Sequence, residues 1–238
     1  MKKSWPYLVP GLVLLLFSGA AEGDNTVFFR DDFHHLDNWK PYYFRNIDRH
    51  TKYDIEKRED ISILVSTSDS SASALISNQR FSVEQYPIIH WRWKVDQVLA
   101  GGNYRRKSGD DYPLRIYVVF EYDPQTADFG TKMKYELART LHGEYPPHSS
   151  VNYIWANRAD ERDIVANPFT DRAMMIPLQY GPEQVGRWLE ETVNVYEDYL
   201  KVFGEPPPPV ASLAIMNDSD NTGEAATSYL DFIEIRTH

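Results

Sequence analysis

Residues 88–95 read IIHWRWKV, in which apolar and polar side chains alternate from Ile89 onward. Both tryptophans, Trp91 and Trp93, fall on the apolar face, and the opposite face carries ionisable groups: His90, Arg92 and Lys94. Successive side chains of a β-strand point to opposite sides of the sheet, so a two-residue period predicts a strand with one buried face. We therefore predict that both indole rings pack in a core and are not free to stack on a sugar.

The same alternation extends the strand prediction along the chain. Residues 114–122 (LRIYVVFEY) repeat it, with the apolar set on one face and Arg115, Tyr117 and Glu121 on the other. The other predicted strands are short runs separated by polar turns, at residues 61–66, 151–156, 173–179, 210–216 and 229–235.

One segment has helical spacing. Largely apolar side chains recur there at intervals of four, three, four and three residues: Trp188, Thr192, Val195, Tyr199 and Val202. This spacing predicts one amphipathic helix near residues 186–203, ended by Gly204. Many strands, a single helix and no regular alternation between them favour an all-β fold. We expect two antiparallel sheets packed face to face as a jelly-roll-like sandwich.

Length and composition limit the class of protein. The chain has 238 residues, and we expect residues 24–238 to form a single β-sandwich domain. A net charge of −10 argues against nucleic-acid binding. The absence of cysteine excludes disulfides, thiolate metal sites and cysteine nucleophiles.

The N-terminus has the features of a secretory signal peptide. Two lysines precede an apolar run at residues 7–17, and small residues follow, so we expect cleavage after Ala20 or Gly23. The run is too short to span a bilayer comfortably. We expect an exported protein, periplasmic or secreted, with no stable membrane anchor once residues 1–23 are removed.

Two polar clusters are candidate sites. The first, at the start of the strand predicted for residues 114–122, comprises Asp110, Asp111 and Arg115. Paired carboxylates can divide acid and base roles, or they can hold an arginine in a bidentate grip. A structural aspartate–arginine clasp is at least as compatible with this cluster as catalysis.

The second cluster follows the strand predicted for residues 210–216 and comprises Asp218, Asp220, Asn221 and Thr222. It is not an EF-hand loop, because the twelfth position counted from Asp218 is Tyr229, which has no carboxylate. Three interpretations stay open: a polar turn that bonds its own backbone, a saccharide or other ligand contact, and an irregular calcium site.

Strand pairing decides which further side chains join these clusters. If the two clearest strands pair, Arg92 lies beside Arg115 and Tyr117 on a charged, aromatic sheet face. Asp198 is a further candidate, because its neighbour Tyr199 lies on the apolar stripe of the predicted helix. That stripe places Asp198 near the boundary between helix and sheet.

Six segments in order resemble domain-of-unknown-function family 3047: HWRWKV, GDDYPLRIYVVFE, YIWAN, NPFT, VYEDYLKVFGEPPP and LAIMNDSDNTGEAATSYLDFIEI. That family consists of exported bacterial proteins. The resemblance runs from about Asp31 to the C-terminus. It implies a single sandwich domain and brings no established catalytic residues. The end segments FRDDFHHLDNW and YLDFIEI also resemble strands of carbohydrate-binding jelly rolls, a likeness at the level of fold.

Three functions are compatible with these residues. The leading hypothesis is an exported sandwich that binds a saccharide or similar polar envelope ligand through the two clusters, Tyr117, Arg92 and Asp198. The alternative is a glycan hydrolase or lyase that uses one aspartate from each cluster. Carboxyl separations of about 5–5.5 Å or 6.5–9.5 Å would support a hydrolase. The third is a non-catalytic envelope scaffold, which would expose an apolar patch. Catalytic activity, metal dependence and oligomeric state stay open.

Overall fold

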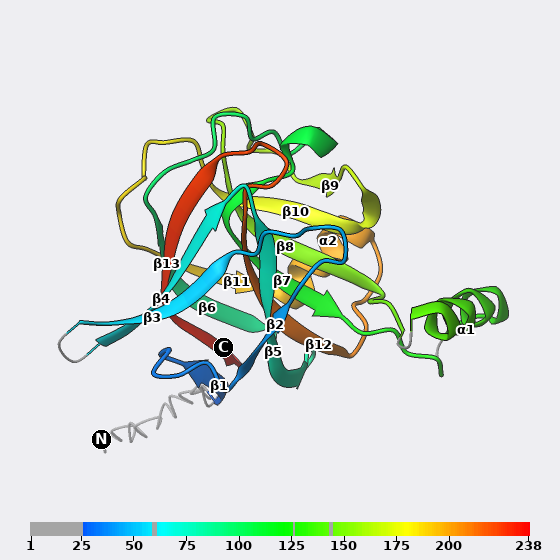
Figure 1. Ribbon diagram of the computed structural model, residues 1–238. Helices are drawn as coiled ribbons and strands as arrows, with labels where there is room; N and C mark the ends of the chain where they lie inside the picture. The colour runs from blue at the N-terminus through cyan, green and yellow to red at the C-terminus, as the bar shows by residue number, and fades with distance from the viewer. Residues whose placement is uncertain (1–25, 59–60, 126, 143–144) are drawn as a thin grey trace, which may run out of the picture.

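The computed structural model describes residues 26–58, 61–125, 127–142 and 145–238, which form two β-sheets packed face to face (Figure 1). The predicted all-β sandwich is therefore confirmed. The predicted signal peptide, residues 1–23, lies outside the described residues. Among the described helices, none is both long and apolar enough to cross a membrane.

Sheet A is the smaller sheet, with strand order β11-β6-β13-β4-β3 and with β1 also paired to β13. Its strands are β1 (Val27–Asp31), β3 (Lys52–Arg58), β4 (Ile61–Asp69), β6 (Ile88–Val95), β11 (Leu189–Asn194) and β13 (Ala225–Arg236). Its described strand pairs are antiparallel.

Sheet B has strand order β2-β5-β12-β7-β8-β10-β9. Its strands are β2 (Trp39–Tyr42), β5 (Ala72–Ser82), β7 (Tyr112–Phe120), β8 (Ser149–Ala156), β9 (Val165–Asn167), β10 (Thr170–Tyr180) and β12 (Val210–Asp218). β8 and β10 run parallel, and the other described pairs are antiparallel.

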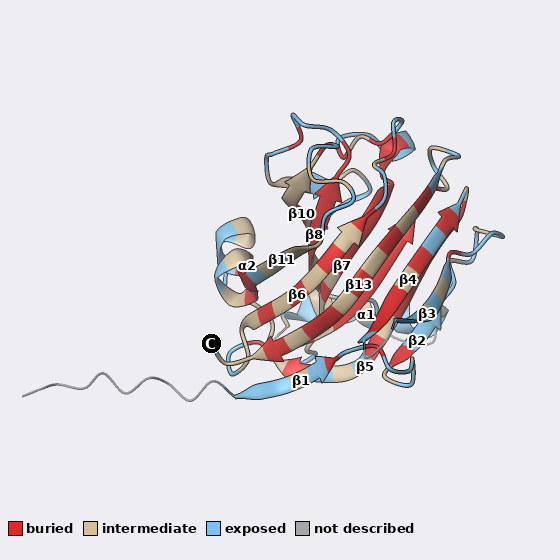
Figure 2. Cartoon of the chain, turned by 90° about the vertical axis from the view of Figure 1, so that its left-hand side faces the viewer, coloured by how far each residue is buried: buried red, intermediate tan, exposed pale blue. Residues whose placement is uncertain are grey.

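The core lies between the sheets and contains the two tryptophans of β6. Trp91 and Trp93 are fully buried, as predicted, and buried and partly exposed residues alternate along β6 (Figure 2). Both rings reach sheet B. The Trp91 centroid lies 5.6 Å from that of Tyr153, and the Trp93 centroid lies 5.7 Å from that of Trp155. These large aromatic contacts join the two sheets.

The predicted pairing of residues 88–95 with residues 114–122 is wrong. β6 lies in sheet A between β11 and β13, whereas β7 lies in sheet B between β12 and β8. Alternation shows which side chains face the core, but it does not identify the hydrogen-bonded neighbour. The apolar faces of both strands meet in the same core, so their polar faces point to opposite sides of the sandwich.

The helix predicted near residues 186–203 is shorter than expected. Leu189–Asn194 form strand β11, which pairs with β6, and helix α2 spans Val195–Phe203. The Asn194 side chain caps the helix by accepting a hydrogen bond from a backbone N–H of its first turn at 3.1 Å. Gly204 ends it as predicted, in the left-handed region at φ 73°.

A second helix, α1 (Phe129–His142), adds to the predicted elements and projects from the sandwich (Figure 1). The side of α1 that faces the sandwich is held by Tyr135, whose ring stacks on that of Tyr122 with centroids 3.7 Å apart. The Tyr135 hydroxyl also donates to the backbone carbonyl of Pro147 at 3.2 Å. These contacts set the base of α1 beside the end of β7.

Candidate ligand-binding site

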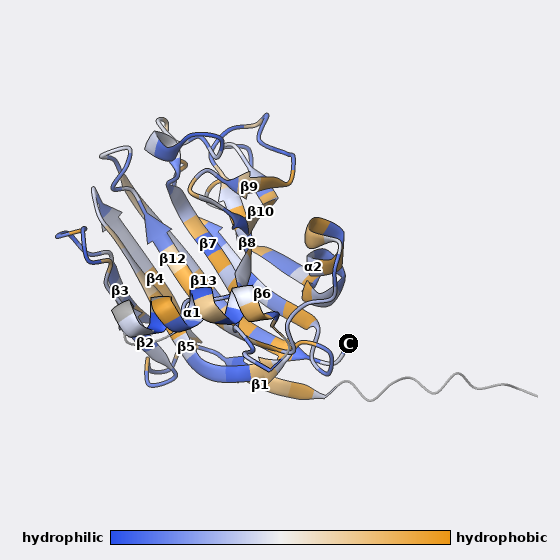
Figure 3. Cartoon of the chain, turned by 90° about the vertical axis from the view of Figure 1, so that its right-hand side faces the viewer, coloured by the Kyte–Doolittle hydropathy of each residue, from blue (hydrophilic) through white to orange (hydrophobic). Residues whose placement is uncertain are grey.

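A cavity of about 380 Å³ lies on the outer face of sheet B, the face turned away from sheet A. Figure 3 shows both hydrophobic and hydrophilic segments along β7 and β12, whose sequences are YPLRIYVVF and VASLAIMND. Outward-pointing side chains of β7, β8 and β12 build the cavity floor: Arg115, Tyr117, Asn152, Met216 and Asp218. Polar side chains from β9 and from the loops next to β7 and β12 add the rim: Asp110, Asn167, Asp220 and Asn221.

Arg115 is the central cation of the cavity. Its side chain is buried, yet it lines the cavity, and its guanidinium donates to Asp218 Oδ2. Its Nη1 lies 3.7 Å from Asp110 Oδ1. Burial opposes the charge, but Asp218 raises the pKa of Arg115 above its ordinary value, so the guanidinium stays charged. Among the described residues, its Nε and Nη1 atoms have no hydrogen-bond partner.

Two carboxyl groups of the second cluster have raised pKa values, whereas a simple salt bridge would lower the pKa of a carboxyl group. Burial raises the pKa of Asp218, Arg115 opposes this rise, and the neighbouring Asp111 adds to it. Burial and Asp111 also raise the pKa of Asp220. One arginine therefore does not offset the effect of burial and of neighbouring acids on these carboxyl groups.

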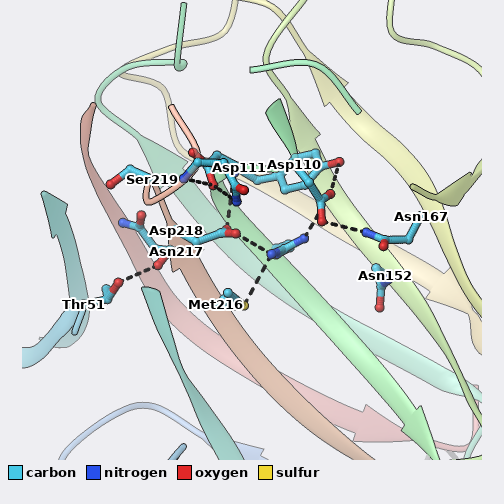
Figure 4. A network of polar contacts seen from close by, with 12 residues as sticks. Thr51, Asp110, Asp111, Asn152, Asn167, Met216, Asn217, Asp218 and Ser219 are labelled. Atoms are coloured by element: carbon cyan, nitrogen blue, oxygen red, sulfur yellow. Dashed lines mark hydrogen bonds and ion pairs between the residues drawn. The ribbon is translucent and has the colours of Figure 1, made fainter. Parts of the chain in front are cut away.

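Asp111 organises the loop after β12. Its Oδ1 accepts hydrogen bonds from the backbone N–H and the side-chain amide of Asn221, at 3.3 and 3.0 Å. Its Oδ2 accepts from the backbone N–H of Thr222 at 2.6 Å. Asn221 reaches the cavity wall, but Thr222 and Asp111 do not line it. The two predicted clusters are thus joined, with Asp111 as the link (Figure 4).

Asp110 is held by partners on the other side of the cavity. Its carboxylate accepts from Tyr112 Oη at 3.1 Å and from Asn167 Nδ2 at 2.8 Å (Figure 4). Asn152 lies nearby and is almost fully buried, and its Oδ1 has no hydrogen-bond partner among the described residues. Neither asparagine is among the site residues predicted from the sequence. The available signals are that Asn152 is the amide within the predicted strand VNYIWA and that Asn167 opens the segment NPFT.

A metal ion is one candidate occupant of the carboxylate cluster. Asp111, Asp218 and Asp220 each offer an oxygen, and these oxygens lie within 4.8 Å of one another. However, N–H groups already bind both oxygens of Asp111, and the charged Arg115 binds Asp218. A cation at this place would compete with a guanidinium, so the calcium site stays a prediction with a poor donor set.

Two predicted site residues lie away from the cavity. Arg92 is on the outer face of sheet A, where its Nη1 pairs with Asp231 at 3.0 Å. Asp198, on α2, accepts a hydrogen bond from Tyr153 Oη at 2.7 Å. Because the Tyr153 ring lies in the core, Asp198 is on the opposite side of sheet B from the cavity. Arg92 lies outside the site because β6 belongs to sheet A, and Asp198 lies outside it because α2 packs at the edge of the core.

The sequence profile described as "Protein of unknown function (DUF3047)" matches residues 37–234, so the chain belongs to this family. The resemblance noted in the sequence is therefore confirmed. No curated protein matches the sequence.

Several solved structures have a similar β-sandwich fold at low sequence identity. A family 30 carbohydrate-binding module of a cellulosomal cellulase of Clostridium thermocellum has 9% identity and a TM-score of 0.39, over 84% of this chain and 90% of the module. Crh5 transglycosylase in complex with NAG has 11% identity and a TM-score of 0.42, over 88% and 83% of the two chains. Endoglucanase 3 of Trichoderma harzianum, from family GH12, has 10% identity and a TM-score of 0.39, over 90% and 98%.

Proposed function

We propose that this DUF3047 protein is an exported saccharide-binding protein that holds a neutral, hydroxyl-rich unit of its ligand in the cavity on sheet B. The observation that supports this most directly is Arg115. It is 4% exposed, it lines the cavity, and two of its guanidinium nitrogens have no hydrogen-bond partner among the described residues. An unpaired buried donor is costly, and a ligand that accepts hydrogen bonds removes that cost.

The other polar groups of the cavity require a ligand that also donates. Asn152 Oδ1 is a buried acceptor without a partner among the described residues, and Asp220 is a half-buried carboxylate on the rim. A hydroxyl group both donates and accepts, so a polyol satisfies Arg115 and these acceptors together. The aspartates would repel an anionic ligand, and the guanidinium would repel a cationic one. The mixed donors and acceptors therefore favour a neutral polyol.

The walls of the cavity suit the apolar face of a sugar ring. Tyr117 lies on the floor, and Phe44, Ile47 and Phe169 complete the lining. Aromatic rings provide flat apolar surface, and Tyr117 adds a hydroxyl group. Pockets of this size, with apolar walls and a few convergent polar groups, are typical of small-molecule sites.

Binding is favoured over glycoside hydrolysis by the state of the carboxylates. A hydrolase needs two carboxyl groups free to act on opposite sides of the scissile bond. Here Asp111 is bound by loop N–H groups, Asp218 by Arg115, and Asp110 by Tyr112 and Asn167. Asp220 is left as the acid of the site with no side-chain partner among the described residues. A single such acid is sufficient to orient a hydroxyl but does not form a catalytic pair.

Calorimetric titration with a panel of neutral oligosaccharides tests the proposal. We expect Tyr117→Ala to weaken binding by about three- to tenfold, as loss of an aromatic contact of about 0.5–1.5 kcal/mol predicts. Tyr43→Ala is the matched control, because Tyr43 is an exposed tyrosine that packs on His50 and does not line the cavity. Absence of binding to the whole panel would refute the proposal, and release of shorter sugars would replace it with hydrolysis.

Export is a separate part of the proposal and rests on the signal-peptide features of residues 1–23. We expect the mature protein to begin after Ala20 or Gly23 and to be recovered from the periplasm or medium. N-terminal sequencing of the protein expressed in a Gram-negative host checks this. A retained first methionine in the cytoplasmic fraction would contradict it.

A further inference from the structure

A second cavity, of about 350 Å³, continues the first along the outer face of sheet B. Ala173 of β10 lines both cavities. Along β8, Asn152 lines the first cavity and Ser150 the second. Two strand residues span about 7 Å, which is on the order of one sugar ring. The two cavities are therefore adjacent compartments on this face of sheet B.

The charge of the second cavity is opposite to that of the first. The first is lined by Asp110, Asp218 and Asp220 with the single cation Arg115. The second is lined by Lys134 of α1 and Arg172 of β10, and by no acid among the described residues. A ligand that extends from the first cavity into the second thus meets a change from acceptors to cationic donors.

One cation of the second cavity, Arg172, is held in place by His148. Arg172 Nε donates to the backbone carbonyl of His148 at 3.2 Å, and its Nη2 lies 2.7 Å from His148 Nε2. Burial and the charge of Arg172 lower the pKa of His148, so the ring is a neutral acceptor that orients Arg172. Glu205, whose charge also reaches His148, lines a neighbouring cavity instead. Lys134 is positioned next to Tyr135, which anchors α1.

Hydroxyl groups complete this second compartment. Ser150 of β8 and Thr170 of β10 line it together with the two cations. Cationic side chains with nearby hydroxyls form charge-assisted hydrogen bonds with carboxylates and with other oxyanions. The compartment therefore has the chemistry of an anion subsite beside a neutral polyol subsite.

We infer that the ligand is an oligosaccharide of at least two units with an anionic substituent, a uronate carboxylate or a sulfate ester, bound between Lys134 and Arg172. This inference rests on the proposed saccharide function and specifies its ligand class. The neutral ring occupies the cavity of Arg115 and Tyr117, and the charged unit occupies the cavity of Arg172.

Titration of the full mature chain with matched oligosaccharides tests the inference. The probes are neutral, uronate-bearing and sulfated oligosaccharides of one to six units. We expect the preferred charged oligomer to bind at least tenfold more tightly than its neutral counterpart and than its charged monomer, and its affinity to fall with salt. The uronate and sulfate arms identify which anion the compartment prefers.

Substitutions separate the two compartments. The double variant Lys134→Gln/Arg172→Gln should lower affinity for the charged oligomer about tenfold or more, and it should lower affinity for the neutral counterpart much less. Lys132→Gln is the matched control on the same helix, because Lys132 does not line this cavity. Equal affinity for charged and neutral oligomers, or an unaffected double variant, overturns the inference while the proposed function stands. If the unsubstituted protein binds no saccharide, charged or neutral, the proposed function itself is refuted.

Discussion

Substitution of Arg115 by methionine removes the only cation, among the described residues, that lines the first cavity on sheet B. Both partner carboxylates are more than nine-tenths buried, so the variant leaves negative charge in the protein interior without compensation. Breaking a buried ion pair in this way typically costs about 3–5 kcal/mol. At about 2–4 °C per kcal/mol for a chain of this size, we expect the melting temperature to fall by about 6–20 °C.

The pH dependence identifies the mechanism. The pKa of Asp218 is raised in the folded protein by burial, and Arg115 opposes that rise, so the variant raises it further. A raised carboxyl pKa means that stability is present at low pH and is lost as the pH rises through the folded pKa. The difference in melting temperature between wild type and Arg115→Met should therefore be largest at pH 7 and should shrink towards pH 4.5.

Thermal unfolding followed by circular dichroism at both pH values measures this. Arg80→Met is the control, because Arg80 pairs with Glu121 at the surface and should change stability by less than about 1 kcal/mol. The double variant Arg115→Met/Asp218→Asn should recover much of the loss, since it removes a buried charge. A deficit that is independent of pH, or a double variant as unstable as Arg115→Met, would show that lost packing and not stranded charge is responsible.

Three further substitutions probe other parts of the structure. Asn217→Ala removes the amide donor of two buried backbone carbonyls in sheet A and should cost about 2–3 kcal/mol in urea denaturation. Asp220→Asn should stabilise the protein at pH 7 by less than about 1 kcal/mol, because burial and Asp111 raise the Asp220 pKa. That gain should vanish in a pH series of melting curves as the pH falls below about 4. Asn194→Ala should cost about 1 kcal/mol in the same urea assay through loss of the α2 cap.

Alternation is a local property, and it was sufficient to predict strands β4, β6, β7, β8, β10, β12 and β13. It did not reveal β2, β3, β5, β9 or β11. It was not sufficient to assign strands to sheets. Residues 88–95 and 114–122 have equivalent patterns, yet β6 and β7 belong to different layers. The predicted site consequently includes Arg92, and it has Arg115 and Tyr117 on the correct face of their strand but beside the wrong neighbouring strand.

The helix prediction failed over residues 189–194 for a related reason. Residues four positions apart share a face in a helix and also in a strand. The first interval of the predicted stripe, Trp188 to Thr192, is therefore compatible with both structures, and pairing with β6 selects the strand. From Val195 onward, intervals of four and three exclude a strand, and there the helix is present.

The joining of the two aspartate clusters depended on a long-range contact. β7 and β12 are neighbours, and Tyr112 lies opposite Asp218 in their register. The loop before β7 and the loop after β12 therefore meet at one end of sheet B, although they are about a hundred residues apart in sequence. Nothing local in either segment specifies this pairing, whereas the residue types that would make a polar site once they met were visible in both.

The charge balance of the cavity distinguishes a ligand site from a structural clasp. A clasp requires one carboxylate for Arg115, and Asp218 already supplies it. Asp110 and Asp220 add further acidic groups to the cavity wall, and burial together with Asp111 raises the pKa of Asp220. Stability alone favours apolar replacements for surplus buried charge. Groups that lower stability while pointing into a cavity are explained if they bind hydroxyls there, so the surplus acids support a binding role for this face of sheet B.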